Sequence, residues 1–95
     1  MTTLGNKQFA IEYVVSVLKE DIPQLPQNIR QTIKQAIESR LMINPMLFGK
    51  PLRYSLSGLR SLRVGDYRVI YTINSTEFRV SIVSIAHRRD VYENL

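Results

Sequence analysis

Two strand-like runs joined by a two-residue turn place the strongest constraint on the fold of this chain. Leu59 to Val64 and Tyr67 to Ile73 both interleave apolar residues with arginine, and Gly65-Asp66 lies between them. Such runs separated by two turn residues predict an antiparallel β-hairpin. A third run, Phe78 to His87, follows a turn at Asn74 to Glu77. The second half of the chain is therefore expected to form a three-stranded antiparallel meander.

Apolar periodicity in the first half predicts one strand and two helices. Lys7 to Tyr13 alternates weakly and is expected to form the first strand. Pro23 should end the first helix near Ile22, because the residue before proline avoids helical angles. Pro26 suits the first position of the second helix. The predicted buried stripes are Val14, Leu18, Ile22 and Leu25 in the first helix, and Ile29, Ile33, Ala36, Ile37 and Leu41 in the second.

The order of these elements predicts an α+β fold, β-α-α-β-β-β, in which two helices cover one face of an antiparallel sheet. Gly49-Lys50-Pro51 is expected to be a connecting loop rather than a domain boundary. With 95 residues the chain has room for one core, so residues 1–95 should form a single domain. The sheet face without helices would be open to solvent and free to hold arginine side chains.

Positive charge is concentrated in the predicted sheet. Eight of the 13 Lys and Arg residues fall in the last 46 positions, against four of the eight acidic residues, and the net charge is +5. Guanidinium groups fixed on strands suit a polyanion such as a nucleic acid. A solvated basic surface without such a partner is the alternative. Strand alternation allows Arg63 and Arg68 to lie close together on the open face, across the hairpin.

Composition excludes several kinds of site. The chain has no cysteine, which excludes disulfides and thiolate metal sites, and a single histidine, His87, which excludes a multi-histidine metal cluster. No glycine-rich phosphate loop or dinucleotide motif indicates a cofactor. No apolar run approaches membrane-spanning length, and Met1 to Asn6 lacks the features of a signal peptide. A cytoplasmic location without membrane contact is therefore expected.

Two motifs resemble a known family. Gly65-Asp66-Tyr67-Arg68-Val69-Ile70-Tyr71, followed by His87-Arg88-Arg89-Asp90-Val91-Tyr92, looks like the RelE/ParE superfamily of bacterial toxins. Gly49-Lys50-Pro51-Leu52 and the paired helices joined at Leu25-Pro26 are similar too. The resemblance extends from about Phe9 to Tyr92. Its terminal basic run ending in tyrosine is more similar to the RelE branch than to the ParE branch.

The resemblance implies the toxin of a type II toxin–antitoxin pair, an endoribonuclease that enters the ribosomal A site and cuts mRNA without a metal. In that reaction the 2′-hydroxyl of one nucleotide attacks the adjacent phosphorus and the 5′-oxygen leaves. It requires charge stabilisation, an acceptor for the 2′-hydroxyl proton and a donor for the leaving oxygen. The implied partners are a cognate antitoxin, the 70S ribosome with its mRNA, and operator DNA through the antitoxin complex.

The same resemblance implies roles for individual residues. Arg68 matches the arginine that holds the scissile phosphate, and Tyr92 matches the C-terminal tyrosine that orients or stacks on the nucleotide. Arg88 matches the proton donor, but His87 is chemically the easier acid, so the choice between them stays open. A strand-end role for His87 and core packing of the Tyr92 ring are the structural alternatives. Three more arginines are expected to bind substrate: Arg60, Arg63 and Arg89.

The sequence departs from the family pattern at two positions on the predicted hairpin. Some members have basic residues at the positions of Leu59 and Ser61, where this chain has none. Removing one transition-state donor can lower a rate by roughly 10²–10³. Two alternative functions stay open. One is a ParE-like inhibitor of DNA gyrase that acts by binding, and the other is a catalytically decayed homologue that binds only its antitoxin.

Overall fold

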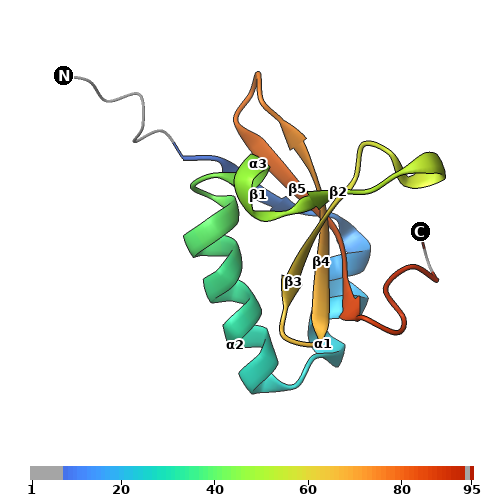
Figure 1. Ribbon diagram of the computed structural model, residues 1–95. Helices are drawn as coiled ribbons and strands as arrows, with labels where there is room; N and C mark the ends of the chain where they lie inside the picture. The colour runs from blue at the N-terminus through green and yellow to red at the C-terminus, as the bar shows by residue number, and fades with distance from the viewer. Residues whose placement is uncertain (1–7, 94) are drawn as a thin grey trace.

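The structure, a computed structural model, describes residues 8–93 and 95 (Figure 1). Lys7, the predicted start of the first strand, lies outside the described residues. The elements η2 and η3 are π-helical turns and η4 is a 3₁₀ turn. In chain order the elements are β1 (Ala10–Tyr13), η2 (Val17–Asp21), α1 (Ile22–Gln24), α2 (Gln27–Ala36), η3 (Ile37–Leu41), α3 (Pro45–Phe48), β2 (Lys50–Pro51), η4 (Tyr54–Leu56), β3 (Arg60–Val64), β4 (Tyr67–Asn74) and β5 (Arg79–His87).

The strands form one five-stranded sheet in the order β1-β5-β4-β3-β2. The predicted α+β class and the meander of β3, β4 and β5 are confirmed. Gly65, in the turn between β3 and β4, has a positive φ of 60°, which glycine adopts without steric cost. The sheet is mixed rather than wholly antiparallel, because β1 pairs in parallel with β5.

The second difference from the prediction lies at Gly49-Lys50-Pro51, which is not simply a loop. Lys50 and Pro51 form the short edge strand β2, in which Lys50 pairs with Ser61 and Pro51 with Arg60. Proline is tolerated there because an edge strand needs hydrogen bonds on one side only. The pairing places the Lys50 backbone directly beside β3.

The main core lies between the helices and one face of the sheet. The predicted stripe of the second helix is confirmed: Ile33, Ala36, Ile37 and Leu41 are buried and Ile29 packs against them. They meet buried side chains of the sheet, namely Leu62, Val69, Tyr71, Val80, Ile82 and Ile85. The sheet therefore has one face committed to core packing, and alternation directs the intervening side chains to the other face.

The prediction for the first helix is wrong in two respects. Val17 is fully buried there, whereas Val14 and Leu18 are exposed. The helical segment also continues through Pro23 and ends at Gln24, and the next residue, Leu25, is extended with a ψ of 138°. The reason is the π-helical turn η2, in which the N–H of Ile22 bonds to the carbonyl of Val17. A π turn is wider than an α turn, so it rotates the apolar stripe away from the positions that regular helical spacing predicts.

The second face of the sheet is not fully open, contrary to expectation. Ser61 pairs with Ile70 and Ile70 with Ser84, and all three are buried on this face. Val91, in the segment after β5, is buried too, although neither it nor Ile70 belongs to the main core cluster. Part of this face is therefore buried, and the arginines occupy positions on the remainder. None of the helices in the described part of the chain is long and apolar enough to cross a membrane.

Candidate functional site

Two arginines lie side by side on the face of the sheet that the helices leave uncovered. The pairing of β3 with β4 sets Arg63 directly opposite Arg68 and Leu62 opposite Val69. Since Leu62 and Val69 point into the main core, both arginines point to the other face, as alternation predicts. Like charges directly opposite each other are unfavourable in a sheet. An anion bound between them would remove that cost, so the geometry suits a phosphate.

The two arginines line a shallow hollow of about 160 Å³ together with Phe48, Lys50 and Ser61. Within residues 8–93, Arg68 makes no hydrogen bond or ion pair, and Arg63 donates only a long bond of 3.3 Å from Nε to the carbonyl of Gly65. The hollow therefore has three cationic side chains whose donors are largely free. Local sequence pattern does not reveal Phe48 or Lys50 as site residues, because the pairing of β2 with β3 joins segments that this pattern does not connect.

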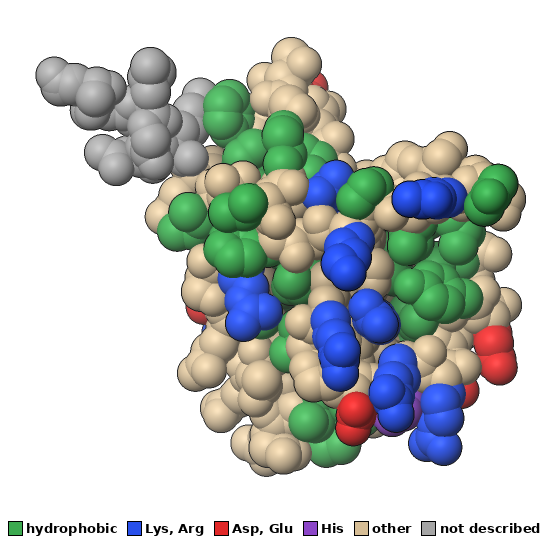
Figure 2. Space-filling view, in the orientation of Figure 1, with side chains coloured by type: hydrophobic (Ala, Val, Ile, Leu, Met, Phe, Trp, Pro, Cys, Tyr) green, Lys and Arg blue, Asp and Glu red, His purple; other side chains and the backbone are tan. Residues whose placement is uncertain are grey.

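The positive surface continues from this hollow to the end of β5. Figure 2 shows Lys and Arg side chains gathered in a band over the β3–β4 hairpin and the start of the C-terminal segment. The backbone N–H of Arg88 donates to the carbonyl of Asp66 at 2.8 Å, and its Nε lies 4.0 Å from the Asp66 carboxylate. The backbone of Arg88 is therefore fixed beside the hairpin turn. The ion pair is exposed and long, and so contributes little stability.

His87 lies on the opposite side of the sheet from Arg68. It is paired with Tyr67, whose ring it meets edge-to-face with centroids 5.4 Å apart, on the helix-covered face. Its Nδ1 accepts hydrogen bonds from the backbone N–H and the Nε of Arg89, at 3.2 and 3.4 Å. His87 lines a separate hollow of about 250 Å³ with Asp21 and other residues. The structure therefore does not bring His87 or the Arg89 guanidinium together with the Arg63–Arg68 pair.

Arg60 also lies apart from the hollow. Its Nη2 donates to the carbonyls of Met46 (2.7 Å) and Gly49 (2.6 Å), which holds the segment containing α3 against the sheet. Opposite it in the pairing, the Tyr71 hydroxyl donates to the carbonyl of Pro45 at 2.7 Å. Burial raises the pKa of Tyr71, and the neighbouring Arg60 partly offsets that rise. These bonds assign Arg60 to the support of α3 and β2.

Tyr92 is exposed in the segment after β5. The neighbouring residue Val91 is fully buried, and the backbone N–H of Val91 donates to the carbonyl of His87 at 3.1 Å. The segment is therefore anchored next to Tyr92. The exposed ring is free to contact a ligand, and it does not pack into the main core. In the part of the chain that the structure describes, no three His, Asp or Glu side chains lie close enough to hold a metal ion.

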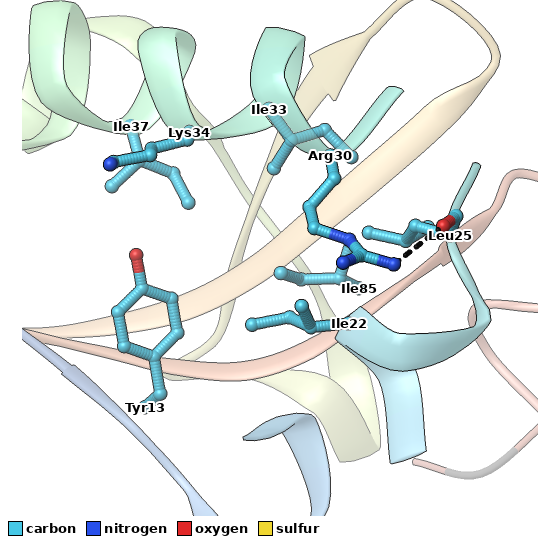
Figure 3. A pocket seen from close by; sticks show the side chains of 8 residues that line it. All are labelled: Tyr13, Ile22, Leu25, Arg30, Ile33, Lys34, Ile37 and Ile85. Carbon is cyan, nitrogen blue, oxygen red and sulfur yellow. Dashed lines mark hydrogen bonds between the residues drawn. The ribbon is translucent and has the colours of Figure 1, made fainter. Parts of the chain in front are cut away.

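An apolar hollow of about 200 Å³ lies between α2 and β5, separate from the hollow of the Arg63–Arg68 pair (Figure 3). Figure 3 shows Arg30 extending from α2 toward Leu25, where Nη2 donates to the carbonyl of Leu25 at 3.1 Å, and Lys34 on the same helix. The molecule therefore has a second surface that combines apolar lining with positive charge. The lining residues are Tyr13, Ile22, Leu25, Arg30, Ile33, Lys34, Ile37 and Ile85.

Comparison with known proteins identifies relatives of this chain in sequence and in fold. A sequence model of the family described as the ParE toxin of the type II toxin–antitoxin system parDE matches residues 12–92. Two proteins of Mycobacterium tuberculosis are similar in sequence. Toxin RelE is 39% identical over 79 residues, which is 83% of this chain and 81% of that protein. Toxin RelG is 35% identical over 74 residues, which is 78% of this chain and 85% of that protein.

Solved structures of other proteins are similar to this chain in fold. The toxin–antitoxin complex RelBE2 of M. tuberculosis contains a chain with a TM-score of 0.80 and 30% identity, covering 85% of this chain and 99% of that one. The E. coli RelBE complex contains a chain with a TM-score of 0.68 and 20% identity, covering 83% and 95%, which shows the shared fold alone. This small α+β domain with a basic sheet face is therefore the toxin component of a type II toxin–antitoxin system. The chain belongs to the RelE/ParE superfamily of these toxins.

Proposed function

We propose that this toxin is an endoribonuclease that cuts mRNA in the ribosomal A site. The observation that supports this function best is the Arg63–Arg68 pair, which lies directly opposed on an uncovered sheet face without acidic partners among the described residues. A pentavalent phosphorane has more negative charge than the phosphate from which it forms. Preplaced guanidinium donors therefore stabilise it more strongly than the ground state, which is what catalysis requires.

The positions of the other side chains support the following proposed roles. Arg68, which has no hydrogen-bond or ion-pair partner among the described residues, holds the scissile phosphate, and Arg63 adds charge beside it. Arg88, fixed at the hairpin turn, is the better placed of the two candidates to donate to the leaving 5′-oxygen, since His87 lies on the other face. Tyr92 orients the nucleotide through its exposed ring, and Arg89 contacts outlying phosphates.

The partner that controls this toxin is proposed to be a cognate antitoxin. The similar structures of M. tuberculosis and E. coli are toxin–antitoxin complexes. The apolar hollow flanked by Arg30 and Lys34 suits an acidic amphipathic segment, because an apolar side chain can enter it while carboxylates meet the basic rim. Operator DNA would be reached through that complex.

The decisive experiment maps cut sites on mRNA in a translating extract that contains the purified toxin or a variant. Arg68→Ala should lower the cleavage rate by about 10²–10³, while its unfolding curve stays close to that of the wild type. Arg40→Ala, at an exposed arginine of η3, is the matched control and should cleave normally. Cleavage by Arg68→Ala at the wild-type rate would contradict the assigned role.

A second candidate function is inhibition of DNA gyrase by binding, which the match to the ParE toxin family favours. The two functions separate in one pair of assays. A gyrase inhibitor blocks supercoiling of plasmid DNA and leaves mRNA intact, whereas the endoribonuclease cuts mRNA and leaves supercoiling unchanged. A toxin that did neither, and allowed normal growth without its antitoxin, would be a decayed homologue.

A further inference from the structure

The hollow beside the arginine pair has a wall formed by Phe48, Lys50 and Ser61. The three residues come from α3, β2 and β3. Lys50 lies directly opposite Ser61 in the pairing of β2 with β3, so the edge strand adds an ammonium group next to β3. Phe48 is 45% exposed although its side chain is large and apolar. An aromatic ring beside three cations is the combination that binds single-stranded nucleic acid.

Ser61 supplies an independent sign that the wall receives a ligand. It is only 5% exposed, and its hydroxyl has no hydrogen-bond partner among the described residues. Buried hydroxyls are normally hydrogen-bonded, because an unpaired one is unfavourable. A phosphate oxygen in the hollow would accept a hydrogen bond from the Ser61 hydroxyl and remove that cost. Arg63 and Arg68, lining the same hollow, would contact the other oxygens of that phosphate.

The wall is held in place from the core side. Arg60 donates to the carbonyls of Met46 and Gly49, and Tyr71 donates to that of Pro45. Phe48 and Lys50 flank Gly49 in the chain, so these bonds fix the backbone from which both side chains project. A binding residue that is positioned before the ligand arrives loses less conformational entropy on binding.

We propose that Phe48, Lys50 and Ser61 form a nucleotide subsite for single-stranded RNA. Lys50 and Ser61 contact a backbone phosphate together with the arginine pair, and the Phe48 ring stacks on the adjacent base. This inference rests on the proposed function, since it adds residues to the same site. Stacking on an aromatic ring tolerates every base, so the subsite contributes affinity with little sequence preference. Arg60 is a positioning residue that acts through the backbone of α3.

The test measures binding of a short, fluorescently labelled single-stranded RNA, 2′-O-methylated so that it cannot be cleaved, at several salt concentrations. Phe48→Ala should weaken binding about 5- to 100-fold without changing the salt dependence. Phe48→Leu keeps the apolar bulk without the ring and should also weaken binding, while Phe48→Tyr should bind like the wild type. Lys50→Gln should lower the slope of log K against log salt by about 0.7.

Two matched controls separate the wall from general effects. Leu47→Ala removes an exposed apolar side chain from α3 that does not line the hollow, and Lys19→Ala removes an exposed charge from η2. Both should bind RNA like the wild type. Thermal unfolding of every variant should stay close to wild type, because the side chains of Phe48 and Lys50 are exposed.

The outcomes distinguish this inference from the proposed function. If Phe48→Leu and Lys50→Gln bind RNA like the wild type while Arg68→Ala abolishes mRNA cleavage, the subsite is overturned and the function stands. If the wild type cleaves no mRNA on ribosomes, but Phe48→Leu and Lys50→Gln bind RNA more weakly than the wild type, the subsite stands and the function fails. Equal losses from Leu47→Ala and Phe48→Ala, or no RNA binding by the wild type, would also overturn the subsite.

Discussion

The hydroxyl of Tyr71 occupies the space that a side chain at Gly49 would need. A Cβ built on Gly49 would overlap this hydroxyl and the ring carbons next to it. Glycine is required here by space and not by backbone angles, because the φ of Gly49 is −94°. The close approach lets Tyr71 bond to the carbonyl of Pro45 while Arg60 bonds to the carbonyl of Gly49. One buried ring thus fixes the position of α3 and β2.

Gly49→Ala should therefore destabilise the protein by about 1–3 kcal/mol, the usual cost of overpacking a core. Urea unfolding measures the change. RNA binding should fall as well, since the displaced segment includes Phe48 and Lys50. Tyr71→Phe in the same background removes the hydroxyl, the nearest overlapping atom, so the added cost of Gly49→Ala should be smaller there. Equal costs in both backgrounds would show that the hydroxyl is not the obstacle.

Stability should fall at alkaline pH. Burial raises the pKa of Tyr71 from 10.0, against a smaller opposing effect of Arg60, and burial with the nearby Glu38 charge raises that of Tyr13. The unfolded chain, with the ordinary pKa, loses these protons first. The stabilisation that the two protonated tyrosines give the folded state is thus complete below pH 10. It is lost as the pH rises from 10 towards the raised pKa values of the folded state. Urea unfolding across this range should show a shallower fall for Tyr71→Phe, and an unchanged slope would contradict the assignment.

Asp21 connects the first helical segment to the sheet. Its Oδ2 accepts the backbone N–H of Ile85 at 2.9 Å, beyond the point where β1 stops pairing with β5 at Ile82. Asp21→Ala leaves this partly buried N–H without an acceptor and should cost about 1–2 kcal/mol. Asp21→Asn keeps an acceptor oxygen and should cost less, while Glu20→Ala is the exposed control. Amide hydrogen exchange at Ile85 should accelerate in Asp21→Ala only.

Arg63→Thr should stabilise the fold while it weakens function. Removing one of two directly opposed arginines relieves a like-charge contact, a gain of about 0.2–1 kcal/mol, and threonine suits an exposed strand position. RNA affinity and mRNA cleavage should fall in the same variant. Arg79→Thr is the matched control, since Arg79 on β5 is paired with Glu12 at 2.8 Å. A loss of stability from Arg63→Thr as large as that from Arg79→Thr would contradict the argument.

The elements that were predicted correctly depend on residues close in the chain. The Gly65-Asp66 turn sets the β3–β4 register, and through it the Arg63–Arg68 pair. The stripe from Ile29 to Leu41 identified the second helix in the same way. The first helix was wrong because the hydrogen bond from Ile22 to Val17 creates a π turn that regular spacing does not reveal. The sequence therefore predicted the two arginines of the hollow and missed Phe48 and Lys50, which α3 and β2 supply.

Local residue order alone determined the strands of the meander, the second helix and the pair of arginines, because turn chemistry and side-chain alternation act over a few residues. Only the tertiary structure decided that Lys50 lies beside Ser61, that His87 faces the helices and that Arg60 supports α3. Those relations depend on how distant segments pack around Tyr71 and along the edge of β3. Packing of that kind depends on the whole core and not on residues that are close together in the sequence.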